Sequence, residues 1–218
     1  MSNEAWIRTT RLVSALTITA GLAVQAWADL TFGTFSWDQL PGYFTPLAAL
    51  AGVIALLAAA LHPHPHRWWI DLLRVNALTY LTIAGVVYWL LLAAHTTPKV
   101  PWANAILHGG AAVILLADWI MFGQRRRLPV RTWWTVLVVP ALWASYLIMR
   151  ASRDGWVPYP FLDPARGTAA IAGTLAIIAG CGLALVGLFH LCVYLRPSPL
   201  AAPVTGTFAV RPHARRLP

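Results

Sequence analysis

The chain has 218 residues, of which 59% are hydrophobic and only 11% are charged. Soluble globular domains carry about a quarter charged residues, and a core of this size could not hide so much apolar surface from water. The composition therefore excludes an ordinary soluble domain. The formal net charge is +9, but the basic residues lie in short segments between apolar runs. This is the arrangement of membrane topology signals, so no nucleic-acid partner is expected.

Six apolar segments are long enough to cross a bilayer, which takes about 20 helical residues. They run approximately over residues 12–28, 44–61, 75–94, 102–122, 132–149 and 168–195. The sequence therefore predicts an all-α integral membrane protein with a six-helix transmembrane domain over residues 1–195. Residues 196–218 are rich in Pro and Arg and are expected to form a basic, disordered cytoplasmic tail. The first segment also resembles a cleavable secretory signal, because Ala26-Trp27-Ala28 follows its apolar run.

Lys and Arg are divided unequally between the two sides that these spans define. Lys99, Arg150, Arg153 and Arg166 lie on one side, and the other twelve lie on the side of both termini. Because cytoplasmic loops carry the excess of Lys and Arg, both termini are expected to be cytoplasmic. Removal of the first segment as a signal would not invert the other five.

Two further patterns predict how the spans sit in the membrane. Nine Trp residues near span ends are expected to anchor at the headgroup level: Trp27, Trp37, Trp68, Trp69, Trp102, Trp119, Trp133, Trp134 and Trp156. In the last span, small residues recur every four positions, at Ala172, Ala176, Gly180 and Ala184. This spacing lets a second helix approach closely, which predicts packing inside the bundle, with a dimer interface as the alternative.

Ionisable side chains inside a span are costly, so each is a functional candidate. His108 lies about two turns into the fourth span and is followed by Gly109 and Gly110, which let a helix or a ligand approach the backbone. The structural alternative is a histidine that bonds a neighbouring carbonyl group. Asp118 and His190 lie near the inner ends of their spans and are expected to reach interfacial water.

Thr45 opens the second span in the run Gly42-Tyr43-Phe44-Thr45-Pro46. Thr followed by Pro is typical of a helix start. By pattern alone, Thr45 is therefore expected to be an N-cap whose hydroxyl accepts from free backbone N–H groups.

Two loop segments carry further polar residues. The segment 156–164 has three prolines between aromatic residues, which predicts a stiff piece of chain on the outer membrane surface. Its Asp163 belongs either to a solvated turn or to a lid over a lipid-facing cavity. The run His62-Pro63-His64-Pro65-His66 alternates potential ligands, but proline holds the ring nitrogens apart, so no metal or other cofactor is expected.

Several of these residues carry a family resemblance. The run Val157-Pro158-Tyr159-Pro160-Phe161-Leu162-Asp163 resembles the Tyr-Pro-Phe-Leu-acid stretch of the androgen-induced and androgen-dependent TFPI-regulating membrane proteins. It is closer still to their bacterial relatives, the Pr-six-Pr membrane proteins. Tyr43-Phe44-Thr45, Ile106-Leu107-His108 and the six spans extend the resemblance to about Leu195. It implies a multi-pass protein of the plasma (inner) membrane of a bacterium.

The animal members of this family are intramembrane hydrolases that cleave fatty-acid esters of hydroxy fatty acids with a Thr nucleophile and a His. The resemblance implies these two roles for Thr45 and His108, and membrane lipids or fatty-acid esters as partners. The chain departs from these relatives at Pro46-Leu47-Ala48-Ala49, where they commonly have polar residues, and at Gly109-Gly110 after the His. Both departures lie beside the implied site.

The expected depths of three polar residues agree with a shared site. Thr45 lies about one turn and His108 about two turns from the same boundary, a depth difference of roughly 5 Å that helix tilt can absorb. A hydroxyl nucleophile needs a base, and the base needs an orienting partner; Thr45, His108 and Asp163 supply these three types. The predicted function is a lipid or fatty-acid esterase. The alternatives are a non-catalytic lipid-binding or transport protein and a haem protein ligated by His95 and His108.

Overall fold

The structure is a computed structural model that describes residues 3–62, 67–122 and 128–195. These residues form helices, turns and loops, and no strand occurs among them. Within this part of the chain, six helical stretches are long and apolar enough to cross a membrane: Asn3–Thr31, Phe44–Leu61, Trp68–His95, Pro101–Met121, Val130–Asp154 and Thr168–Val193. The predicted all-α, six-span architecture is confirmed to this extent, whereas the predicted tail and the middle of the His-Pro run lie outside the described residues.

The spans are not uniform α-helices. The first two are α1 (Asn3–Thr31) and α2 (Phe44–Leu61), and the last is α7 (Thr168–Leu195). The third continues from α3 (Trp68–Val87) into a π-helical segment, Tyr88–Leu92, and a 3₁₀ turn, Ala93–His95. The fourth consists of α4 (Pro101–Ala105), a π-helical segment Ile106–Gly110 and α5 (Ala111–Met121). In the fifth, a 3₁₀ segment Val130–Leu137 precedes α6 (Val138–Asp154).

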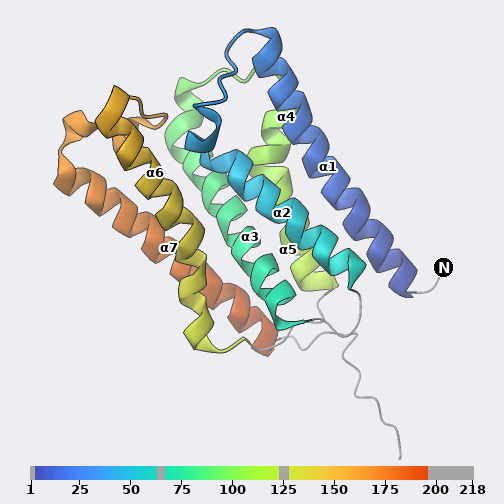
Figure 1. Cartoon of the computed structure of the whole chain (residues 1–218). Coiled ribbons are helices and arrows are strands. Elements are labelled where there is room, and N and C mark those ends of the chain that lie inside the picture. Colours follow the sequence, from blue (N-terminus) through green and yellow to red (C-terminus); the bar gives the residue numbers. More distant parts are fainter. Residues whose placement is uncertain (1–2, 63–66, 123–127, 196–218) are drawn as a thin grey trace, which may run out of the picture.

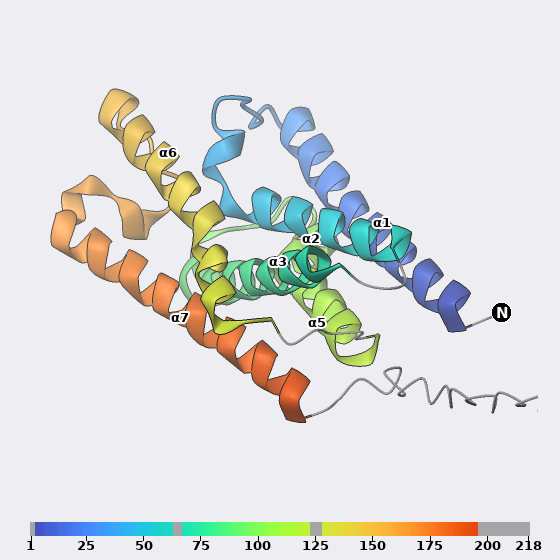
Figure 2. The ribbon, with the colours of Figure 1, turned by 60° about the horizontal axis from the view of Figure 1, so that its bottom comes forward.

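The helix α3 lies in the middle of the bundle (Figures 1 and 2). It packs against α2, α5 and α7, and α1 packs along α2. Because six spans reverse direction five times, α1 begins and α7 ends at the same end of the bundle (Figure 1). We call this the termini end, and the opposite end, where α2 begins at Phe44, the Thr45 end.

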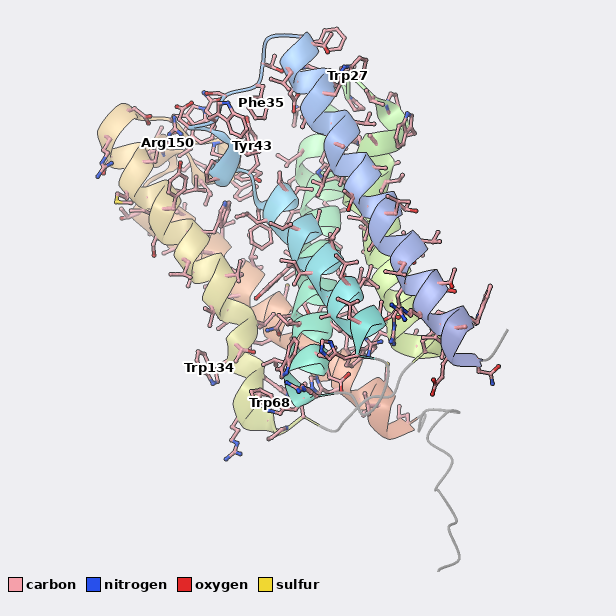
Figure 3. All side chains as sticks on the ribbon, turned by 45° about the vertical axis from the view of Figure 1, so that its right-hand side comes forward. Trp27, Phe35, Tyr43, Trp68, Trp134 and Arg150 are labelled. Carbon is pink, nitrogen blue, oxygen red and sulfur yellow. The ribbon has the colours of Figure 1, made fainter. Side chains whose placement is uncertain are left out.

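The outer surface of the bundle is apolar, as a lipid-facing surface must be. Exposed Trp27 lies near the Thr45 end, and exposed Trp68 and Trp134 lie near the termini end (Figure 3), where the sequence predicts anchors. Trp119 does not fit this prediction. It is 1% exposed, and its indole N–H donates to the carbonyl oxygen of Phe189, 3.1 Å away, so it belongs to the core.

The small-residue ladder of α7 faces outward, so the prediction that it packs inside the bundle is wrong. Ala172, Ala176, Gly180 and Ala184 are all exposed. A different face of α7 is buried, with Gly182, Val186, Phe189, His190 and Val193 spaced along one side of the helix. The close approach occurs on that face, where a Cβ atom at Gly182 would lie 3.3 Å from the Ile83 side chain.

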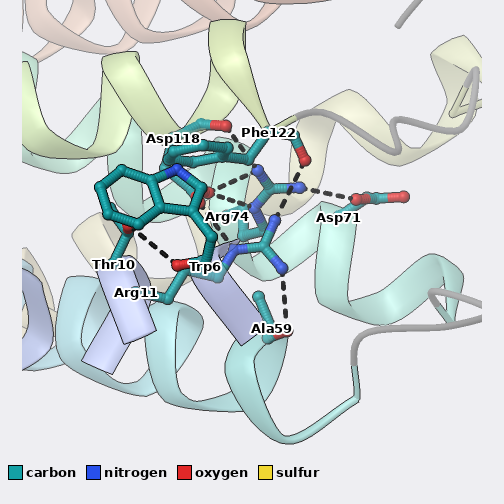
Figure 4. Close-up of polar contacts among 8 residues, drawn as sticks. All are labelled: Trp6, Thr10, Arg11, Ala59, Asp71, Arg74, Asp118 and Phe122. Carbon is teal, nitrogen blue, oxygen red and sulfur yellow. Dashed lines mark hydrogen bonds and ion pairs between the residues drawn. The ribbon is translucent and has the colours of Figure 1, made fainter. Parts of the chain in front are cut away.

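A buried charge cluster joins α1, α3 and α5 toward the termini end (Figure 4). The Asp118 carboxylate accepts from Arg11 Nε at 2.7 Å and from Arg74 Nε at 2.8 Å, and Arg74 Nη1 lies 3.2 Å from Asp71 Oδ1. These side chains are nearly inaccessible to solvent, and their two positive and two negative charges balance. The expectation that Asp118 reaches interfacial water is therefore wrong: paired arginines neutralise it inside the bundle instead.

Arg11 also donates hydrogen bonds to backbone carbonyl groups at the ends of two other helices. Its Nη1 donates to the carbonyl oxygen of Ala59 in α2 at 2.9 Å, and its Nη2 donates to that of Phe122 after α5 at 3.2 Å. Both carbonyls lie near helix C-termini, which lack intrahelical partners. Arg11 thus connects α1 to α2 and α5, in addition to neutralising Asp118 together with Arg74.

His190 is also buried rather than interfacial, with 1% of its surface exposed. Its Nδ1 lies 2.8 Å from the carbonyl oxygen of Val186, one turn earlier in α7. Its ring lies 5.4 Å from that of Trp133 and 6.5 Å from that of Trp119. His190 lies in the last turns of α7, toward the termini end, and is therefore not part of the Thr45 end.

Candidate active site

Thr45 and His108 meet at the Thr45 end of the bundle. Thr45 is the second residue of α2, and His108 lies in the π-helical segment of the fourth span. The Thr45 hydroxyl oxygen is 3.1 Å from His108 Nε2, and both residues are half-buried. The predicted proximity of the two side chains is confirmed. π-Helical segments are rare and frequently occur at functional sites.

Thr45 is not the N-cap of α2, contrary to the prediction from its pattern. The cap is Tyr43, whose side chain makes no capping bond. The backbone N–H of Phe44 donates instead to the Tyr159 hydroxyl, 2.9 Å away, and Pro46 has no N–H to satisfy. The Thr45 hydroxyl is therefore not used as a cap, and it bonds His108 instead.

The second nitrogen of the imidazole fixes its protonation pattern. His108 Nδ1 lies 3.1 Å from the carbonyl oxygen of Asn104, one turn earlier. A carbonyl oxygen can only accept, so Nδ1 carries the hydrogen, and in a neutral imidazole Nε2 is then the acceptor. The Thr45 hydroxyl donates to that acceptor. This is the arrangement in which a histidine can remove a proton from a hydroxyl nucleophile.

Asp163 does not join this pair. Its Oδ1 accepts from the backbone N–H of Ala165 at 2.8 Å, and it caps the short 3₁₀ turn Pro164–Arg166 as an exposed residue. The predicted orienting role of Asp163 is therefore not found; the Asn104 carbonyl occupies the position beside Nδ1. The reason lies in the loop, which turns Tyr159 and Leu162 inward and leaves Asp163 outside.

An apolar cavity of about 300 Å³ begins beside Thr45. It lies between α2, α3, α6, α7 and the loop before α7, and it reaches Val136 and Gly182, which lies halfway along α7. Tyr159 and Phe161 line it from the loop, so this loop covers part of the cavity, as the lid interpretation predicts. Nearly all of the remaining lining is hydrocarbon or aromatic, a surface that suits an acyl chain.

Tyr159 ties this loop to the first turn of α2. Burial raises the pKa of Tyr159 to about 12, so the phenol stays protonated at physiological pH. Its oxygen accepts the Phe44 N–H described above, and its ring packs against Trp143 of α6 at 5.7 Å. One side chain thus connects the cavity cover, α6 and the helix start that positions the Thr45 hydroxyl.

The segment before α2, which contains Asp38 and Gly42, is also bonded to α6. Arg150 Nη2 forms an ion pair with Asp38 at 2.6 Å, and the Tyr146 hydroxyl donates to the Asp38 carbonyl oxygen at 2.9 Å. The Trp143 indole N–H donates to the carbonyl oxygen of Gly42 at 3.0 Å. Arg150 and Tyr43 lie near this segment at the Thr45 end (Figure 3). These bonds define where α2 begins.

Two residues beside His108 were missed by the sequence analysis. The Tyr88 ring stacks on the imidazole, with ring centres 3.8 Å apart and planes inclined by 24°. Asn104 bonds both of these residues, through its side chain to Tyr88 and through its carbonyl to His108. A polar residue four positions before an intramembrane histidine shares its helix face, so the sequence did contain a signal for Asn104.

The haem interpretation finds no geometric support. His95 is exposed at the end of the third span, and both ring nitrogens of His108 already have partners. Within residues 3–62, 67–122 and 128–195, no group of three or more His, Cys, Asp or Glu side chains could hold a metal ion.

Comparisons with known proteins add nothing to this geometry. No protein-family model matches the chain, and neither a curated protein nor a solved structure matches it. The family resemblance of the short motifs therefore stays a prediction.

Proposed function

We propose that the protein is an intramembrane hydrolase of lipid or fatty-acid esters, with Thr45 as nucleophile and His108 as general base. The observation that carries this proposal is the 3.1 Å contact between the Thr45 hydroxyl and His108 Nε2, together with the apolar cavity that Thr45 lines. Such a cavity can hold an acyl chain while the ester carbonyl lies beside the hydroxyl.

The proposed reaction has two stages. His108 Nε2 takes the hydroxyl proton as the Thr45 oxygen forms a bond to the ester carbonyl carbon, and the resulting tetrahedral intermediate expels the alkoxide, which takes the proton from His108. A water molecule then attacks the acyl-threonine carbonyl with His108 again as base. The second tetrahedral intermediate releases a fatty acid and restores the Thr45 hydroxyl.

A second candidate function is a membrane protein that binds or transports lipids without cleaving them. The observation that favours it is the missing acid: a backbone carbonyl, rather than a carboxylate, faces His108 Nδ1. A carbonyl stabilises an imidazolium less than a carboxylate does, because it carries no full charge. The two functions differ in the reactivity of Thr45.

Covalent labelling of Thr45 separates these functions. We expect a fluorophosphonate probe to label the purified protein, Thr45→Ser to retain labelling, and Thr45→Val to lose it completely. Valine has nearly the shape of threonine, and loss of one intramembrane hydrogen bond costs only about 0.6–2 kcal/mol, so Thr45→Val should remain folded. Labelled peptides identified by mass spectrometry are the measurement.

The matched control for this experiment is Thr174→Val. Thr174 is a half-buried residue of α7 whose hydroxyl donates to the carbonyl oxygen of Ala170, 3.0 Å away. Its loss should leave labelling unchanged. Unlabelled wild-type protein, or a Thr45→Val protein that labels as well as wild type, would contradict the hydrolase and leave the lipid-binding function.

We also propose that the termini are cytoplasmic and that the membrane is the inner membrane of a bacterium. Arg11 and Arg74 are neutralised inside the bundle and give no topology signal, but ten of the twelve Lys and Arg residues of that side remain, against four on the other. We expect a reporter fused after Pro218 to read cytoplasmic and one inserted beside Lys99 to read external. The reverse result would move the site to the cytoplasmic face.

A further inference from the structure

We propose that Tyr88 is a positioning residue that holds the His108 imidazole in its reactive orientation. This inference rests on the proposed function, because it assigns the residue that sets the geometry of the Thr45–His108 pair. Tyr88 is 6% exposed and lies at the start of the π-helical segment of the third span. Its ring covers one face of the imidazole at a centre-to-centre distance of 3.8 Å.

The Tyr88 hydroxyl is itself held in place by two polar neighbours. Asn104 Nδ2 donates to it at 2.9 Å, and Thr96 Oγ1, whose hydrogen is directed to the Leu92 carbonyl oxygen, lies 3.3 Å from it. Asn104 then completes the arrangement, because its carbonyl accepts from His108 Nδ1 at 3.1 Å. The side chain of Asn104 thus fixes the tyrosine and its main chain fixes the histidine.

These contacts restrain the imidazole in two independent ways. Stacking on Tyr88 limits how far the ring can tilt out of its plane, whereas the Nδ1–H bond limits its rotation within that plane. With both restraints present, Nε2 points at the Thr45 hydroxyl. A threonine nucleophile gains little from a base that faces it only part of the time, because proton transfer requires hydrogen-bond distance and alignment.

The backbone explains why the third and fourth spans come close enough for this stacking. A Cβ atom at Gly85 would lie only 2.7 Å from the carbonyl oxygen of His108, so glycine is required there. Trp89 donates its indole N–H to the same oxygen at 2.9 Å. The His108 carbonyl oxygen thus contacts the third span at two residues, Gly85 and Trp89, which lie on either side of Tyr88 in the sequence.

The aromatic face also acts on the charge that forms during the reaction. When His108 takes the Thr45 proton it becomes an imidazolium, and the face of an aromatic ring attracts a cation, an interaction of about 0.5–2 kcal/mol. This attraction is stronger after proton transfer than before it, so it favours the transition state over the resting state. Phenylalanine would provide the same face, but an aliphatic side chain would not.

The test compares three variants in hydrolysis of a long-chain p-nitrophenyl acyl ester in detergent micelles. For Tyr88→Leu we expect kcat to fall by about 10- to 100-fold, the loss that a small misplacement of a reacting group can cause, with KM changed by less than about threefold. Tyr88→Phe should lose less kcat than Tyr88→Leu, because the ring remains, but about as much as Asn104→Leu, because both remove the bond between the Tyr88 hydroxyl and Asn104. Asn104→Leu, which frees the Tyr88 hydroxyl but keeps the Asn104 carbonyl, should lower kcat by at least about threefold.

Tyr80→Leu provides the comparison for a cavity-lining tyrosine that does not contact His108. Tyr80 and Tyr88 lie in the same span and both line the cavity, but the Tyr80 ring contacts Phe44 whereas the Tyr88 ring stacks on the imidazole. Its loss should act mainly on KM, whereas the loss of Tyr88 should act on kcat. A structural role alone would lower the amount of folded protein in each variant but would not produce this split.

The outcomes separate this inference from the proposed function. An inactive wild-type protein that is not labelled by the fluorophosphonate probe would overturn the hydrolase itself. An active wild type with an unchanged kcat in Tyr88→Leu would overturn only the positioning role. If Tyr88→Leu is not recovered in folded form, Asn104→Leu decides, and an unchanged kcat in that variant overturns the inference.

Discussion

Replacing His108 with alanine is expected to abolish ester hydrolysis and probe labelling while the protein remains folded in its membrane. A general base contributes about 10²- to 10⁴-fold to rate, so the activity should fall to background. The structural role of His108 is smaller, because an intramembrane hydrogen bond contributes only about 0.6–2 kcal/mol to stability. Catalytic and structural roles therefore predict different phenotypes for the same substitution.

His108→Gln sharpens this test, because the amide can keep a hydrogen bond to the Thr45 hydroxyl but cannot take its proton. We expect it to be as inactive as His108→Ala. His190→Ala is the matched control, since His190 is an intramembrane histidine that also bonds a carbonyl one turn earlier but lies toward the termini end. Labelling and hydrolysis should persist in His190→Ala protein that remains folded. Normal labelling of His108→Gln would show that His108 is not the base.

Much of the fold follows from apolar periodicity and length, but the span boundaries do not. The first helix begins at Asn3 and the third at Trp68, well before the predicted starts at residues 12 and 75. In both cases an arginine near the predicted boundary, Arg11 or Arg74, was counted among the charges on the side of both termini. The structure pairs both with Asp118. A single residue's hydropathy cannot reveal a partner that is 107 residues away.

The site shows a similar division between what the sequence predicts and what it leaves open. Thr45 and His108 could be matched because both lie on regular spans, where depth follows from residue counting. The position of Asp163 could not be derived this way, since it depends on how three prolines fold the loop before α7. Tyr88 was missed because an aromatic residue near a span end is more often a membrane anchor than a positioning group. What distinguishes Tyr88 is its position in a π-helical segment, which the sequence pattern does not predict.

The second large effect is expected from the buried charge cluster. Asp118→Asn should destabilise the protein by about 3–5 kcal/mol, because removing one member of a buried ion pair leaves its partner uncompensated. Here two guanidinium groups bind the same carboxylate. Arg11 Nε lies 2.7 Å from Asp118 Oδ1, and Arg74 Nη2 lies 2.5 Å from Asp118 Oδ2. The measurement is the midpoint of thermal unfolding in detergent, together with the yield of folded protein in the membrane.

Asp163→Asn is the control for Asp118→Asn. It makes the same chemical change in an exposed residue, and asparagine caps a helical turn about as well as aspartate, so both stability and activity should be unchanged. The same control tests the orienting role once expected for Asp163, since a loss of activity there would restore it.

A double substitution, Arg11→Met with Asp118→Leu, should recover part of the stability that Asp118→Asn loses, because well-packed apolar groups can replace a buried ion pair at little cost. The recovery should be incomplete, because the carbonyl oxygens of Ala59 and Phe122 would lose the donors that Arg11 supplies. An Asp118→Asn protein with unaltered stability would mean that water compensates the two arginines, and α1 would then be held by apolar packing alone.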